Sequence, residues 1–114
     1  MKEKLNKLKN WGCDINGALE RFLNDTDLYF ECLSMFEEDE NFEALKLHIN
    51  DSNQKIPFGY VHTLKGVSGN LGITPLFESL SELCEALRNE VYDPNSGLYE
   101  RTVVDYNIFL EIMK

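Results

Sequence analysis

Apolar residues recur every three or four positions along most of the chain, a spacing typical of helices that bury one face. No segment alternates apolar and polar residues between turn residues, as a half-buried strand would. The pattern therefore predicts an all-α protein. No repeat or low-complexity stretch divides the 114 residues, so we expect residues 1–114 to form a single domain.

The first half of the chain predicts two helices. A short helix covers about residues 14–23, with Asp14 as its N-cap. A second helix begins near Asp25 or Thr26, and its apolar face continues to Ile49, which predicts one long helix. The four polar residues that follow, Asn-Asp-Ser-Asn, break the pattern and offer caps for the next helix.

The third predicted helix follows this break. It ends near Leu71, because Gly72 is placed to adopt the left-handed conformation that terminates a helix. Its start is less sharply defined. Pro57 is tolerated only within the first turn of a helix, so the helix begins between Ser52 and Ile56.

A fourth helix has a strong start signal, with Thr74 as the N-cap and Pro75 as the first helical residue. Its apolar stripe consists of Leu76, Leu80, Leu83, Leu87 and Val91. A turn over 93–97 separates it from a last helix at about 98–113. Four substantial amphipathic helices joined by short turns predict an antiparallel up-and-down four-helix bundle. We expect the short N-terminal helix to cap one end, with Trp11 packed there.

The composition excludes several classes of protein. Acidic residues number 20 against 11 basic ones, and this net charge of -9 opposes binding to nucleic acid. The three cysteines have no metal-binding or redox spacing. The N-terminus has no signal-like apolar stretch and no apolar run could span a membrane, which predicts a cytoplasmic protein. We interpret the acidic run at 37–40 as a solvated helix face.

The segment at 61–72 carries the candidate chemistry. At about 100° per helical residue, one face gathers a histidine, two glycines and a lysine, together with three residues from the preceding turns. These residues are Lys55, Phe58, Gly59, His62, Lys65, Gly66 and Gly69. The opposite face is apolar, with Leu64, Val67 and Leu71. We therefore expect His62 to face solvent while the other side of the helix enters the core.

The two glycines inside this helix call for a reason, since each costs roughly 1 kcal/mol relative to alanine. A bare surface at Gly66 and Gly69 would let another macromolecule approach the imidazole of His62. Close packing by a neighbouring helix is the alternative explanation, and the sequence leaves both open.

A neutral imidazole is a nitrogen nucleophile near pH 7, because its reference pKa is ~6.5. Phosphorylation would place about two negative charges on one ring nitrogen of His62, and Lys65 is one turn further along the helix. The sequence contains no glycine-rich nucleotide loop and no recognisable nucleophile–base arrangement. A phosphoryl carrier would need neither if its partner supplied the metal and the carboxylates.

The segment 62–72, His-Thr-Leu-Lys-Gly-Val-Ser-Gly-Asn-Leu-Gly, resembles the signature of the histidine-containing phosphotransfer (HPt) domains of multistep phosphorelays. Segments 22–36 and 76–88 resemble the family's first bundle helix and the helix after the histidine. Two features depart from the family. Val61 replaces the common alanine, and Pro57 with Gly59 makes the start of the helix unusual.

The resemblance implies a phosphorelay intermediate in two-component signal transduction. His62 would accept a phosphoryl group from a receiver-domain aspartate and pass it to another receiver aspartate. Lys65 would stabilise the charge, and Gly66, Gly69, Phe58, Gly59 and Lys55 would form the docking face. Such a carrier is not an enzyme and needs no cofactor or metal of its own, because Mg²⁺ belongs to the receiver.

The expected partners are response-regulator receiver domains, a hybrid sensor kinase, or both, and the expected state is a monomer. Two alternatives stay open: a phosphoacceptor module excised from a larger sensor kinase, and a bundle that only binds receivers. His48 and Cys84 are interpreted as a surface residue and a core residue without a functional role.

Overall fold

A computed structural model describes residues 1–114, and all its regular elements are helices, which confirms the predicted all-α class. In chain order they are α1 (Lys2–Trp11), α2 (Ile15–Arg21), α3 (Thr26–Glu37), α4 (Glu40–His48), α5 (Lys55–Asn70), α6 (Thr74–Arg88), the 3₁₀ helix η1 (Pro94–Ser96) and α7 (Leu98–Met113). None of these helices combines the length and the apolar character that crossing a membrane requires.

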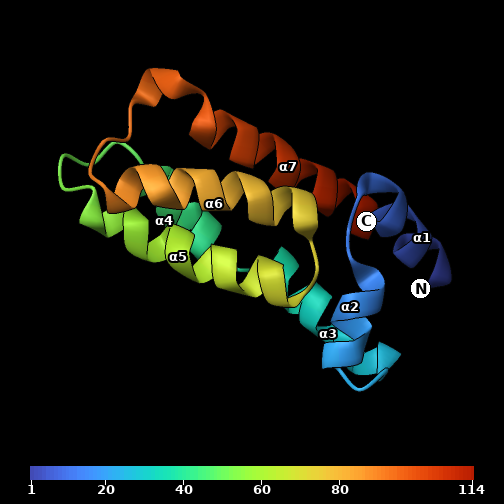
Figure 1. Ribbon diagram of the computed structural model, residues 1–114. Helices are drawn as coiled ribbons and strands as arrows, with labels where there is room; N and C mark the ends of the chain where they lie inside the picture. The colour runs from blue at the N-terminus through green and yellow to red at the C-terminus, as the bar shows by residue number, and fades with distance from the viewer.

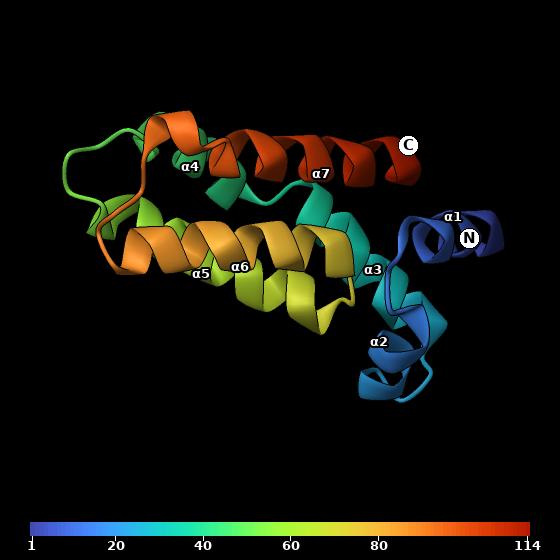
Figure 2. The same cartoon turned by 45° about the horizontal axis from the view of Figure 1, so that its top comes forward.

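The four helices α4 to α7 pack along the long axis of an elongated molecule of 43 × 21 × 20 Å. The helices α5 and α6 lie side by side, α4 covers α5, and α7 covers α6 (Figure 1). At one end of the molecule, α1 packs against α2 and α7, and α2 packs against α3 (Figure 2). Lys4 Nζ donates a hydrogen bond to the carbonyl oxygen of Met113 at 2.7 Å, which joins the N-terminal helix to the C-terminus.

The core combines apolar residues from all seven α-helices and from the turns between them. The largest side chains that are fully buried include Tyr29, Phe36 and Phe109. Burying an aliphatic or aromatic side chain of this kind contributes roughly 1.5–3 kcal/mol. The predicted leucine stripe of α6 is buried, and so is Cys84, but Val91 lies beyond the end of α6 and is exposed.

Several predicted helix boundaries are confirmed. Asp14 caps α2 by accepting a hydrogen bond from the backbone N–H of Gly17 at 3.0 Å. Asp25 caps α3 in the same way through the N–H of Leu28. Gly72 follows the C-cap of α5 with a φ of 72°, a left-handed conformation that a side chain would strain.

The prediction of one long helix to Ile49 is wrong, because the chain forms α3 and α4 with a break at Glu38 and Asp39. Asp39 is the N-cap of α4, and its carboxylate accepts a hydrogen bond from the N–H of Asn41 at 2.8 Å. The carbonyl of Glu37 accepts a hydrogen bond from the hydroxyl of Tyr106 at 3.1 Å. The acidic run is therefore a helix break rather than one solvated helix face.

Two further boundaries differ from the prediction. Thr74 is the first residue of α6 and Ile73 occupies the N-cap position, while the hydroxyl of Thr74 donates to the carbonyl of Gly72 at 3.3 Å. The helix α1 was not expected at all. It buries Leu8 completely and packs Trp11 against the core. Only the packing of Trp11 was expected.

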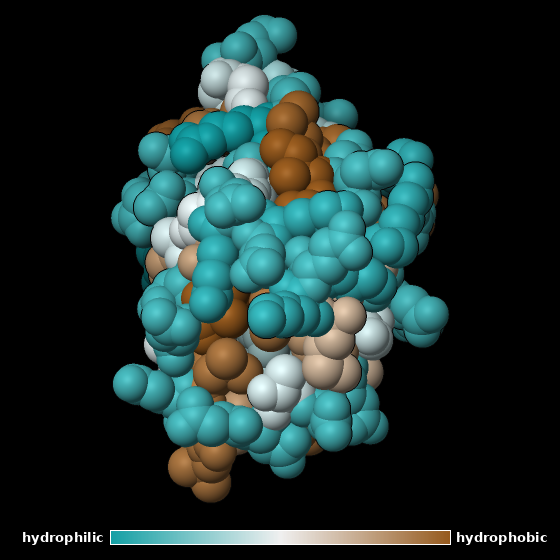
Figure 3. Space-filling view, turned by 90° about the vertical axis from the view of Figure 1, so that its right-hand side faces the viewer, coloured by the Kyte–Doolittle hydropathy of each residue, from teal (hydrophilic) through white to brown (hydrophobic).

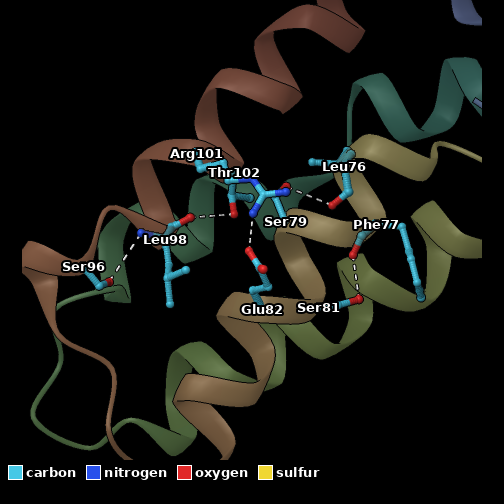
Figure 4. A network of polar contacts seen from close by, with 9 residues as sticks. All are labelled: Leu76, Phe77, Ser79, Ser81, Glu82, Ser96, Leu98, Arg101 and Thr102. Atoms are coloured by element: carbon cyan, nitrogen blue, oxygen red, sulfur yellow. Dashed lines mark hydrogen bonds and ion pairs between the residues drawn. The ribbon is translucent and has the colours of Figure 1, made fainter. Parts of the chain in front are cut away.

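One ion pair joins α6 to α7, and the other polar contacts in this region are local to each helix and its first turn (Figure 4). Glu82 on α6 pairs with Arg101 on α7 across the surface. The buried hydroxyls of Ser79 and Thr102 donate to carbonyl oxygens of their own helices. No buried side-chain nitrogen or oxygen lacks a hydrogen-bond partner, so burying these polar groups carries little penalty. Figure 3 shows that the end formed by α1, α2 and α3 is largely hydrophilic, with separate apolar patches.

The stability of the protein should depend on pH through Tyr29 on α3. Its hydroxyl donates a hydrogen bond to the buried carbonyl of Leu71 at 2.6 Å. Burial raises the pKa of this phenol. The unfolded chain releases the proton above about pH 10, where the folded chain retains it, so stability falls as pH rises through that region. We expect Tyr29→Phe to lose about 1–2 kcal/mol at neutral pH and to show a shallower alkaline decline.

Urea unfolding of both proteins from pH 8 to pH 11 measures this difference. The wild type should lose up to about 1.4 kcal/mol per pH unit more than Tyr29→Phe above pH 10. Parallel stability curves over that range would contradict the role assigned to the buried phenol.

Candidate functional site

The helix α5 presents His62 to solvent because its other side is buried. Val61, Leu64 and Ser68 are fully buried, and α5 packs against α4 on one flank and α6 on the other. His62 itself is exposed, as its helical position predicted. We call the outward residues of α5 the His62 strip. They are Lys55, Phe58, Gly59, His62, Lys65 and Gly66.

The imidazole of His62 stacks on the ring of Phe58, one turn earlier in α5. The two ring centroids are 5.5 Å apart and the planes differ by 17°. Phe58 is half-buried, and its side chain packs against the hydrophobic core, which restricts the movement of its ring. The stack gives an otherwise exposed imidazole a defined neighbour.

Lys65 lies one turn after His62, as the sequence predicted, and it is only partly exposed. Its ammonium nitrogen lies 5.9 Å from the ring centroid of Phe77, which α6 contributes. A cation over an aromatic face gains a modest attraction, roughly 0.5–1 kcal/mol at an exposed site. The contact keeps a positive charge beside the strip without pairing it to a carboxylate.

The structure separates the two glycines that the sequence could not distinguish. A Cβ added at Gly66 would meet no atom within 4 Å, so this position is open space next to His62. A Cβ at Gly69 would lie 2.9 Å from two ring carbons of Phe77, which is closer than real contacts. Gly66 therefore fits the clearance interpretation, whereas Gly69 serves the close packing of α6 on α5 (Figure 4 shows Phe77).

The N-terminal part of the strip is also open. Gly59 has no atom within 4 Å of its Cβ position, and the hydroxyl of Thr63 donates to its carbonyl at 3.1 Å. Lys55, in the first turn of α5, is exposed. Pro57 is the third residue of the helix and is buried, within the turn where proline is tolerated.

A groove of about 410 Å³ lies beside Gly66, between α5 and the chain from α2 to the start of α4. Its lining is mainly apolar and consists of Phe22, Cys32, Met35, Phe36, Asp39, Gly66, Val67, Asn70 and Leu71. Met35 is 70% exposed, which is high for a side chain of its size. Gly66 belongs both to the His62 strip and to the lining of this groove.

Two residues of the site were not predicted from the sequence, and both come from α6. Phe77 contacts Lys65 and fills the space at Gly69. Arg88 places its guanidinium carbon 5.2 Å from the centroid of Phe58. Phe77 and Arg88 reach the strip because α6 packs along α5. No spacing in the sequence predicts which helix packs against α5.

The remaining candidates lie apart from this chemistry. His48 ends α4, where its Nδ1 is 2.8 Å from a carboxylate oxygen of Asp51 and its ring stacks on Tyr60. Cys84 is buried in the core. No group of three or more histidine, cysteine, aspartate or glutamate side chains is placed to hold a metal ion.

Comparison of the chain with family models, with curated proteins and with solved structures found no match. An exposed imidazole can attack an electrophilic phosphorus. Two cations lie near it on aromatic neighbours, Lys65 over Phe77 and Arg88 over Phe58, the ring on which His62 stacks.

Proposed function

We propose that the chain is a phosphoryl carrier of the HPt class, in which His62 accepts a phosphoryl group from a receiver aspartate and passes it to another. The observation that carries the proposal is the surface around His62. An exposed imidazole has a lysine one turn away, and the neighbouring position Gly66 is open space. The resemblance of the segment 62–72 to the HPt signature supports the same function.

The imidazole of His62 is the only group of this chain that takes part in the bond changes of the transfer. A ring nitrogen of His62 forms the P–N bond while the P–O bond of the aspartyl phosphate breaks, and the carboxylate leaves with the electron pair. The imidazole proton passes to water. In this proposal the receiver supplies Mg²⁺ and the acidic residues, and the chain is a carrier rather than an enzyme.

The fold proposal is that α3 with α4 forms one broken member of an antiparallel four-helix bundle, and α5, α6 and α7 form the others. The helix α2, together with α1, caps one end. We further propose that the protein acts in the cytoplasm as a monomer, with receiver domains or a hybrid sensor kinase as partners. The apolar groove beside Gly66 would then take part of the receiver's surface, since the centre of a protein interface is typically apolar.

The test is transfer from phosphorylated receiver domains of the same organism to the full chain. Label should appear on the chain in an acid-labile, base-stable form, and a second receiver should remove it. Binding of receivers without label would favour the binding-only alternative. Neither binding nor label with any receiver would overturn the proposal, and an open reading frame that continues beyond Lys114 would favour the sensor-kinase module.

Lys65 should matter for rate rather than for the identity of the acceptor. Two unit charges 4 Å apart interact by ~1 kcal/mol in water and ~4 kcal/mol at an effective dielectric of 20. We therefore expect Lys65→Ala to slow transfer about five-fold to several hundred-fold, without abolishing it. Lys46→Ala, which replaces an exposed lysine on α4, is the matched control. Equal rates for the two variants would contradict the role of Lys65.

A further inference from the structure

One aromatic ring contacts both the proposed phosphoacceptor and a cation from another helix. Phe58 stacks on the imidazole of His62 at 5.5 Å, and the guanidinium carbon of Arg88 lies 5.2 Å from the centroid of the same ring. Phe58 closes the first turn of α5 and Arg88 is the last residue of α6. The ring therefore joins two helices at the N-terminal side of His62.

The guanidinium of Arg88 is positioned by a neighbouring carboxylate, but its terminal N–H groups are still available to bind an anion. Its Nε lies 3.6 Å from a carboxylate oxygen of Glu85, whose other oxygen accepts a hydrogen bond from the side chain of Asn89 at 3.1 Å. The Arg88 side chain is 49% exposed. A guanidinium has five N–H donors in a planar fork that matches phosphate oxygens, so its terminal nitrogens remain for an anion.

We propose that Phe58 is the positioning residue of this site: its ring holds the imidazole of His62 in one orientation and places Arg88 as a second cation, beside Lys65, for the phosphoryl group. The inference rests on the proposed function and deepens it. An exposed histidine without a stacking partner samples several rotamers, and an aromatic neighbour favours one of them.

The shared ring of Phe58 brings the positive charge of Arg88 near the imidazole of His62. Because His62 and Arg88 both contact Phe58, they are separated by no more than about one Debye length, which is ~10 Å at 0.1 M salt. Lys65 lies on the other side of His62 along α5. Two cations then flank the phosphoryl group, one toward each end of the helix.

The experiment uses phosphoramidate as the donor, because a small donor reports on the site without receiver docking. A ring nitrogen of His62 forms the P–N bond as the donor's own P–N bond breaks, ammonia leaves with that electron pair, and the imidazole proton passes to water. The full chain is compared with Phe58→Leu, Phe58→Tyr, Arg88→Gln and the double variant Phe58→Leu/Arg88→Gln. Each is also followed by thermal unfolding and by NMR of the His62 ring protons.

We expect Phe58→Leu to slow labelling about two- to ten-fold and to remove the ring-current shift of the His62 protons, while Phe58→Tyr restores both. Arg88→Gln should slow labelling and weaken its dependence on salt, with the His62 shift retained. The effects of the two substitutions should not add, because both residues act through one ring. The labelling rate of the double variant should therefore lie within about two-fold of the rate of the slower single variant.

A labelling rate and a His62 ring shift that stay unchanged in Phe58→Leu would overturn the inference. So would equal losses in Phe58→Leu and Phe58→Tyr. Failure of the proposed function is distinguishable, because it would appear as absence of label on His62 in the wild-type chain with phosphoramidate and with receivers alike. A wild type that is labelled at His62, with unaffected variants, would refute the positioning role alone.

Discussion

Replacing His62 with glutamine is expected to abolish phosphoryl incorporation while leaving the fold intact. Glutamine keeps a polar side chain of similar reach but has no nucleophilic ring nitrogen. Because His62 is exposed and the buried side of α5 is untouched, the helix content and the melting temperature should stay close to those of the wild type. The measurement is acid-labile label after incubation with a phosphorylated receiver or with phosphoramidate.

The chain offers a matched control for this variant, since His48 is its other histidine. His48→Gln should retain full labelling, although the contact of its Nδ1 with Asp51 would be lost at the end of α4. Peptide mapping under alkaline conditions, in which phosphohistidine survives, locates the label directly. Undiminished label in the His62→Gln protein would remove the basis of the proposed function.

Helical periodicity predicted the His62 strip because a single helix determines it. Once the segment around His62 is helical, the positions of Lys65 and Gly66 relative to the imidazole follow from the rotation per residue. The apolar positions Val61 and Leu64 then define which side is buried. Local sequence was enough to predict the exposed face, and the structure confirms that exposure.

The break between α3 and α4 could not be predicted in the same way, because its stabilising contacts come from a distant part of the chain. Asp39 can cap a helix or lie on one, and its sequence neighbours do not decide between the two. In the folded protein, the hydroxyl of Tyr106 on α7 bonds the carbonyl of Glu37, and its ring stacks on Phe42 at 3.5 Å between centroids. These contacts favour the two-helix form.

Gly66 and Gly69 show the same limit within the candidate site. Helical geometry places both on the outer side of α5, so the sequence could not assign them different roles. The distinction comes from Phe77 on α6, which fills the space at Gly69 and leaves Gly66 open. Arg88 was missed for the same reason, because it reaches the strip only through the pairing of α5 with α6.

The open position at Gly66 predicts that a bulky side chain there affects transfer and stability in opposite directions. Gly66→Gln should gain up to about 1 kcal/mol of helix stability, since the position is exposed and free of contacts. A receiver must bring its aspartyl phosphate to His62 across this open position. The added side chain should therefore reduce transfer from a receiver sharply, by at least ten-fold. Phosphoramidate is small enough to pass it, so labelling by that donor should be nearly unchanged.

Gly69→Ala is the matched variant, and it should have the opposite profile. Its Cβ would be forced against the ring of Phe77, and overpacking typically costs ~1–3 kcal/mol, which cancels or exceeds the helix-propensity gain of about 1 kcal/mol. We expect a lower melting temperature than that of Gly66→Gln, by roughly 4 °C per kcal/mol, and only a small change in receiver transfer. If Gly66→Gln instead lost stability, or slowed both donors equally, the open position would not be a docking clearance, because only a large partner is excluded by a side chain that a small donor can pass.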